Sequence, residues 1–141
     1  MSPVQIALVK ASFATLAHQP DTFPSSFYGR LFEIDPGLRH LFPSNLTAQR
    51  AKLMQMLGLA VHGLDDLRAL LPAVQSLGAR HAAYGVVEAH YATVGQALLD
   101  ALRASLRGGC TPELEAAWAA VYTVLAGAMQ AGAGQPAVAD A

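Results

Sequence analysis

The feature that most constrains the fold is an apolar helical stripe that ends in a histidine. Leu70, Val74, Leu77 and His81 are spaced four, three and four residues apart, so they share one face of a helix that ends near Gly85. An imidazole at the end of such a stripe needs polar partners, because an unpaired buried polar group costs free energy. The sequence therefore predicts a helix packed against other helices, with His81 binding something between them.

The rest of the chain also has helical periodicity, and alternating strand patterns are absent. Proline, glycine and capping residues divide the chain into six to eight helices, some of them short. Thr47 is expected to cap one helix, and Pro72 is expected to start another. The predicted helices are approximately residues 3–17, 22–35, 36–41, 48–63, 65–71, 72–85, 88–107 and 112–131. We expect an all-α protein, and not a four-helix bundle, because prolines break its middle into short pieces.

One domain is the natural interpretation of 141 residues. We expect residues 1–131 to form it and residues 132–141 to be a flexible C-terminal tail. Charged residues make up only 13% of the chain and hydrophobic residues 53%, whereas soluble proteins average about 25% charged residues. Such an apolar domain either associates or encloses an apolar group, so a monomer and a homodimer both stay open. The net charge of −1 gives no electrostatic case for nucleic acid or an anionic membrane surface.

Several features favour a cytoplasmic protein without a membrane span. The single cysteine, Cys110, excludes an internal disulfide and a multi-cysteine metal site, and it fits a reducing compartment. The N-terminus lacks the basic and then apolar pattern of a signal peptide. The uncharged stretch 116–134 approaches the length of about 20 residues that a membrane helix needs. It consists mostly of alanine and glycine, with bulky residues every three or four positions, so we expect a buried helix of a soluble domain.

The position of His81 fits the chemistry of an iron porphyrin ligand. A neutral imidazole can bind iron through one nitrogen, and its other nitrogen then needs an acceptor. In a helix, the carbonyl of Leu77 lies four residues earlier and can accept that hydrogen bond and orient the ring. For His81 taken alone, an ordinary core or surface histidine is the commoner interpretation, so the haem hypothesis needs support from other motifs.

Five short motifs supply that support. They are FYGRLF at 27–32, DPGLRHLF at 35–42, QRAKL at 49–53, LGARHAAYGV at 77–86 and HYATVGQALL at 90–99. Each is weak alone, but their order and spacing together resemble the globin family. The resemblance is to bacterial single-domain globins and the haem domain of flavohaemoglobins, and more distantly to neuroglobin. It covers residues 3–131 and implies a globin fold, a 3-over-3 helical sandwich around haem b.

The resemblance implies roles on both sides of the haem iron. His81 would be the proximal ligand, and Tyr28 with Gln49 would be the catalytic distal pair. A tyrosine hydroxyl and a glutamine amide can both donate hydrogen bonds to bound O2 in a pocket of low dielectric constant. Such a bond contributes about 1.5–3 kcal/mol, or roughly ten- to a hundredfold in affinity, so we expect slow O2 release.

The remaining cofactor contacts are also implied by the resemblance. Phe42 would stack on the porphyrin, Leu53 would form the apolar ceiling, and Tyr91 would lie next to His81. Lys52 and Arg80 would reach the propionates. The other residues expected to line the pocket are Leu77, Val86 and Val94.

The implied function is reversible binding of O2, NO and CO, with NO dioxygenation as an enzymatic activity that an external electron-donor reductase would support. We expect no reductase domain in 141 residues. In flavohaemoglobins a glutamate joins the tyrosine and the proximal histidine, but the corresponding residue here is Ala133, so we expect a weaker push on oxygen. Two alternatives stay open. One is a gas sensor or O2-storage protein without turnover, and the other is a haem-free stress sensor of globin fold.

Overall fold

The computed structural model describes residues 1–134, and all the regular structure in that range is helical. The elements in chain order are α1 (Pro3–Ala17), α2 (Thr22–Ile34), η1 (Pro36–Leu41), α3 (Thr47–His62), η2 (Gly63–Asp66), α4 (Leu67–Ala83), α5 (Glu88–Leu106) and α6 (Pro112–Ala133). The predicted all-α class is therefore confirmed. Residues 135–141, which hold most of the expected tail, lie outside the described residues.

Local side-chain chemistry sets several helix ends. The hydroxyl of Ser2 accepts a hydrogen bond from the Gln5 amide at the start of α1, and that of Thr111 accepts one from the Leu114 amide at the start of α6. After α4 the chain turns at Gly85, whose φ of 99° lies in the left-handed region that glycine adopts without strain. The stop predicted near Gly85 thus coincides with this turn.

The predicted starts of two helices are wrong. Thr47 is not the cap of α3 but its first residue, and the side chain of Asn45 accepts a hydrogen bond from the Thr47 amide. Pro72 does not start a helix but lies inside α4, which begins at Leu67 with the Asp66 side chain as its cap. A proline this close to a helix start removes only one intrahelical hydrogen bond, and Pro72 is exposed, so water can solvate the freed carbonyl.

The last helix is longer than predicted. α6 continues to Ala133, beyond the end expected at residue 131, and Gly132 is buried there. Residues 132 and 133 therefore belong to the folded domain and not to a tail. The expectation of a buried helix in stretch 116–134 agrees with the burial of Ala117, Trp118 and Val121 on α6. Within residues 1–134, no helix combines the length and hydropathy that crossing a membrane requires.

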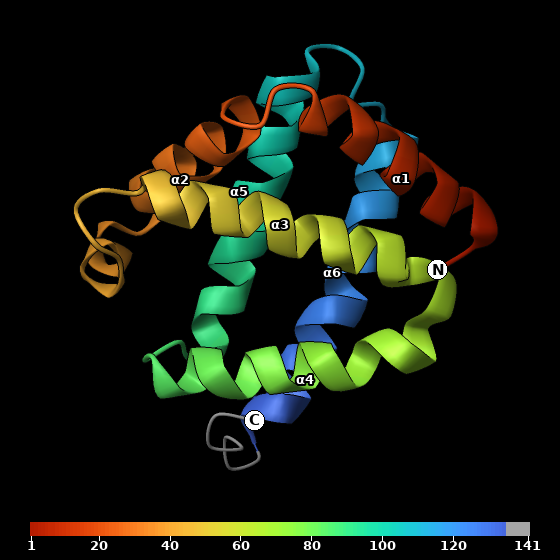
Figure 1. Ribbon diagram of the computed structural model, residues 1–141. Coiled ribbons are helices and arrows are strands. Elements are labelled where there is room, and N and C mark those ends of the chain that lie inside the picture. The colour runs from red at the N-terminus through yellow and green to blue at the C-terminus, as the bar shows by residue number, and fades with distance from the viewer. Residues whose placement is uncertain (135–141) are drawn as a thin grey trace.

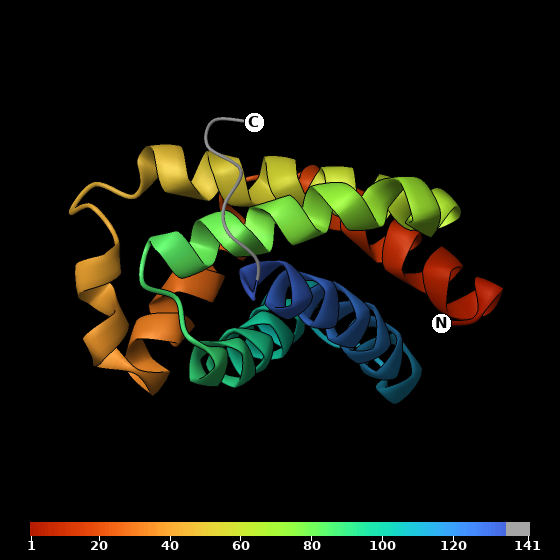
Figure 2. The ribbon, with the colours of Figure 1, turned by 90° about the horizontal axis from the view of Figure 1, so that it is seen from below.

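The helices form two layers that cross each other. In Figure 1, α3 and α4 run across the molecule while α5 and α6 run from top to bottom behind them. Figure 2, seen from below, shows α3 and α4 on one side and α5 and α6 on the other. The most extensive helix pairs are α4 with α6 and α2 with α5. α3 begins and α4 ends on the same side of the molecule (Figure 1).

The core between α1 and α6 is built around Trp118, which is 1% exposed. Its indole Nε1 donates a hydrogen bond of 2.9 Å to the hydroxyl of Ser12 on α1. That hydroxyl in turn donates to a carbonyl of the preceding turn, so the buried polar atoms of both residues are paired. α1 and the N-terminal half of α6 are thereby held together.

Candidate functional site

Tyr28 and Gln49, the two residues expected to form a distal pair, lie in contact. Tyr28 comes from the middle of α2 and is 4% exposed, and Gln49 comes from the first turn of α3. The Gln49 Nε2 donates a hydrogen bond of 3.2 Å to the Tyr28 hydroxyl oxygen. Because that oxygen acts as the acceptor, the hydroxyl proton of Tyr28 stays free to be donated to a third group.

The hydroxyl of Tyr28 stays protonated at neutral pH. Burial raises the pKa of Tyr28 above its ordinary value of 10, and the hydrogen bond from Gln49 opposes this shift only in part. A neutral phenol is a hydrogen-bond donor, whereas a phenolate is only an acceptor. The pair therefore offers a donor, polarised by the amide of Gln49, in an apolar setting.

Phe42 lies beside this pair in an aromatic cluster. Its ring centroid is 5.6 Å from that of Tyr28 and 5.5 Å from that of Phe32, and both contacts are edge-to-face. The guanidinium of Arg39 lies over the face of Phe32 and donates hydrogen bonds to the carbonyls of residues 42–44. The side chain of Phe42 is thus held by contacts with two other rings, and its backbone is held by the hydrogen bonds from Arg39.

His81 occupies the last turn of α4, and its Nδ1 lies 2.8 Å from the carbonyl oxygen of Leu77. A carbonyl oxygen can only accept, so Nδ1 must carry the proton. The Nε2 of the neutral ring is then unprotonated and has a lone pair for a metal. The hydrogen bond expected between these two residues is present, and it fixes both the tautomer and the orientation of the ring.

Burial favours the neutral form of this imidazole. It lowers the pKa of His81 below 6.5, the hydrogen bond to Leu77 opposes the shift, and the charge of Arg80 adds to it. Backbone bonds also close the turn after the ring, since the Val86 amide donates to the His81 carbonyl at 3.0 Å. The side chain is therefore held neutral on a braced helix end.

Tyr91, which is expected to lie next to His81, is in the first turn of α5 and is partly buried. Its carbonyl accepts a hydrogen bond of 2.6 Å from the hydroxyl of Tyr122 on α6. Burial raises the pKa of Tyr122, so this hydroxyl remains a donor. The first turn of α5 is thereby fixed to α6.

The other predicted contact residues divide into apolar and charged sets. Leu53 and Val94 are partly buried and pack against the core, and Leu77 and Val86 are also partly buried. Lys52 and Arg80 are exposed, and neither forms an ion pair with a side chain of residues 1–134. Among the described residues, neither cation therefore has a carboxylate partner.

This set of side chains fits a haem. A neutral imidazole with a free Nε2 comes from α4, and a hydroxyl donor comes from α2. Half-buried apolar side chains and the two exposed cations suit a flat apolar ring that carries carboxylates. The start of α3, the helix that carries Gln49, and the end of α4, the helix that carries His81, lie on the same side of the fold (Figure 1).

Three residues of this region have contacts that the sequence does not indicate. By sequence Phe32 is an ordinary core residue, although its ring bridges Tyr28 and Phe42. Arg39 lies inside the motif at 35–42, but its place there does not indicate that it donates to the carbonyls of residues 42–44. Tyr122 lies in none of the five motifs, and the carbonyl that it reaches is brought near only by the fold.

The sequence profile of the globin family matches residues 25–129. A flavohemoprotein of Bordetella parapertussis is 38% identical over 130 residues, which cover 89% of this chain and 32% of that protein. The chain thus spans about a third of the length of the flavohemoproteins it matches. Neuroglobin-2 of Oncorhynchus mykiss is 32% identical over 139 residues, which cover 89% of this chain and 87% of that protein.

Similar folds are found among solved structures. An engineered carbene transferase from Rhodothermus marinus, described as a candidate nitric oxide dioxygenase, superposes with a TM-score of 0.85. It is 30% identical, and the match covers 96% of this chain and 94% of that one. Similarity over almost the whole of both chains includes the elements that carry Tyr28, Gln49 and His81.

The lowered pKa of His81 makes the stability of the haem-free protein depend on pH. Between the folded pKa and the unfolded value of 6.5, the unfolded chain binds more protons, so stability falls as pH falls through this window. We expect a His81→Gln variant to lose less stability than the wild type between about pH 7 and pH 5. Urea unfolding of the haem-free proteins at several pH values measures this. Equal pH dependence in the two proteins would contradict the assignment.

Proposed function

This chain belongs to the globin family, and we propose that it binds haem b through His81 and retains O2 by means of the Tyr28–Gln49 pair. Membership of the family implies haem binding and the binding of diatomic gases. The iron of the haem supplies the place where O2, CO or NO binds. The proposal extends this to the haem type, the residues and the affinity.

The hydrogen bond from Gln49 to Tyr28 is the observation that carries the O2 proposal. It aligns the phenol, leaves its proton free and polarises that proton by donating to the same oxygen. Such a donor stabilises a diatomic ligand that carries negative charge on its outer atom. It stabilises CO less, because the outer atom of CO carries less charge. Tyr28 is therefore proposed as the main donor, and Gln49 as the group that strengthens and orients it.

The surrounding side chains are proposed to exclude water and hold the ring. Phe42, which contacts Tyr28, is proposed to contribute apolar surface to the site, together with the partly buried residues Leu53, Leu77, Val86 and Val94. The exposed cations Lys52 and Arg80 are proposed to pair with the haem propionates. A site of this kind keeps a polar ligand in a dry environment, where its hydrogen bond to Tyr28 is strong.

NO dioxygenation is the proposed activity of the O2-bound protein, with electrons from a separate reductase in the cytoplasm. The similarity to flavohemoproteins supports it. The alternative is ligand binding without turnover, as in a gas sensor or an O2 store. One observation favours the alternative: residue 133 is an alanine, so no carboxylate at that position can increase the electron donation of His81.

Replacing His81 tests haem ligation. The purified wild-type protein should show a Soret band, and His81→Ala should lose haem or show a shifted spectrum, because its Nε2 lone pair is removed. His18→Ala is the matched control, since His18 is exposed and follows the end of α1, outside the helices that carry His81, Tyr28 and Gln49. An unchanged spectrum and ligand affinity in His81→Ala would show that His81 is not the ligand.

Replacing the distal pair tests O2 retention. Tyr28→Phe should accelerate O2 dissociation roughly ten- to a hundredfold, because a hydrogen bond to a partly charged group contributes about 1.5–3 kcal/mol. Gln49→Leu should have a smaller effect, and in the Tyr28→Phe background it should have almost none, because Gln49 acts through the phenol. Stopped-flow measurement of O2 release gives all four rates. Additive effects of the two substitutions would contradict the proposed order of donors.

NO consumption separates the enzyme from the binding protein. The O2-loaded protein should convert one equivalent of NO rapidly, and repeated turnover should require a reductase and a reduced nucleotide. An NO electrode records both phases. If the first equivalent is consumed but no turnover occurs with several reductases, the enzymatic proposal fails and the alternative of binding without turnover is supported.

A further inference from the structure

Helices α4 and α6 approach each other at two glycines. A Cβ atom added to Gly78 on α4 would lie 1.9 Å from the carbonyl oxygen of Met129 on α6. A Cβ atom added to Gly132 on α6 would lie 1.9 Å from the carbonyl oxygen of Gln75 on α4. Each glycine faces backbone of the other helix, so no side-chain rotation could relieve either overlap.

This close approach is specific to Gly78 and Gly132 and is not shared by every helical glycine of the chain. Gly78 and Gly132 are both buried, whereas Gly127, earlier on α6, is exposed, and a Cβ atom added there would have no atom within 4 Å. The contact is also reciprocal, because Gly78 follows Gln75 at the same spacing in the chain as Gly132 follows Met129. Each helix therefore presents one glycine and one carbonyl to the other.

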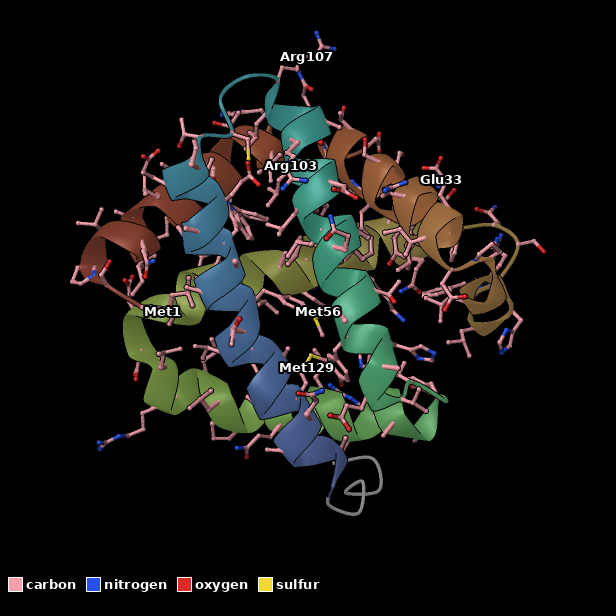
Figure 3. The ribbon with its side chains drawn as sticks, turned by 180° about the vertical axis from the view of Figure 1, so that it is seen from behind. Met1, Glu33, Met56, Arg103, Arg107 and Met129 are labelled. Carbon is pink, nitrogen blue, oxygen red and sulfur yellow. The ribbon has the colours of Figure 1, made fainter. Side chains whose placement is uncertain are left out.

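The crossing is the main attachment of α4 to the rest of the protein. Among residues 1–134, α6 is the only long helix against which α4 packs extensively, and its other substantial contact is with the adjoining η2. Figure 2 shows α6 passing beside α4 near the middle of that helix. Figure 3 shows Met129 on the lower part of α6, where that helix passes α4. The position of α4 is therefore set by how close it lies to α6.

α6 is itself fixed on its other side. A Cβ atom at Gly95 of α5 would lie 2.9 Å from the ring of Tyr122, so this ring fits against the glycine. The hydroxyl of Tyr122 donates to the Tyr91 carbonyl, also on α5. α6 thus packs closely against both α4 and α5.

We propose that Gly78 and Gly132 are positioning residues. The close contact of each glycine with the backbone of the opposite helix sets the position of His81 relative to the haem iron. His81 follows Gly78 within one turn of the same helix, and the bond to Leu77 fixes its ring to that helix. A displacement of α4 from α6 therefore moves the imidazole as well. The inference rests on the proposed function, because it needs His81 to be the iron ligand.

Alanine at either glycine forces the two helices apart. The added methyl group cannot fit at 1.9 Å from a backbone oxygen, so α4 must move outward. The bond between His81 Nε2 and the iron then becomes strained. We expect a lower iron–histidine stretching frequency in the ferrous ligand-free protein, and faster haem loss on the order of tenfold, as for other changes that misorient a metal-binding histidine.

The test compares Gly132→Ala and Gly78→Ala with the matched control Gly127→Ala, which adds the same methyl group to α6 at an exposed position. Resonance Raman spectra give the iron–histidine frequency, and transfer of haem to an acceptor protein gives the rate of haem loss. The two crossing variants should change both quantities, and the control neither. The double variant should change them by less than the sum, because the first alanine has already separated the helices.

Several results would overturn the proposal. One is a folded Gly132→Ala protein with unchanged frequency and unchanged haem loss, even if its thermal stability falls, because a purely structural contact would behave in this way. If both variants fail to fold, hydrogen exchange of the wild type decides. Amides 76–81 should then exchange only with global unfolding, and rapid exchange of these amides would refute the fixed crossing.

The same measurements separate this inference from the proposed haem ligation. If the wild type binds haem and His81→Ala changes its spectrum, the ligand assignment stands whatever the glycine variants do. If His81→Ala has no effect, haem ligation by His81 fails. Slow hydrogen exchange at the crossing would still show that α4 is fixed to α6, but it would no longer concern the iron.

Discussion

The packing of α4 on α6 is the constraint on which the site depends. α4 carries His81, yet it has few contacts with the other long helices among residues 1–134. Its position is therefore set almost entirely by α6, through a crossing so close that only hydrogen fits at Gly78 and Gly132. α6 is in turn held at its other end by the bond from Trp118 to Ser12 on α1. A single long helix thus connects the distant core to the histidine.

Helix existence could be predicted from the sequence because its signals are local. Apolar residues recur with the helical period, and capping residues lie next to the ends that they cap. The errors arise where local signals compete. Thr47 and Pro72 both resemble helix starts, but Asp66 supplies a capping side chain before Leu67, and the exposed position of Pro72 lets the helix continue. A sequence does not tell which of two adjacent start signals is used.

Some contacts of the site could be predicted from the sequence and others could not. The bond from His81 to Leu77 follows from helix geometry alone, since residues four apart face each other. The pairing of Tyr28 with Gln49 joins residues of two helices, and only the resemblance to a family made it predictable. The close approach of Gly78 to the Met129 carbonyl, and of Gly132 to the Gln75 carbonyl, could not be predicted from either source. A glycine in a helix is equally consistent with a cap, a bend or an exposed position, and only the partner backbone distinguishes these cases.

Burial favours the neutral form of both Tyr28 and His81, although it shifts their pKa values in opposite directions. It raises the pKa of Tyr28 and lowers that of His81, so both groups are neutral at physiological pH. A neutral phenol stabilises a ligand by hydrogen bonding without bringing a charge into the pocket. A neutral imidazole bound to a carbonyl, with alanine at residue 133, donates less electron density than one bound to a carboxylate. Under the proposed function, this combination would favour holding a polar diatomic ligand over breaking its internal bond.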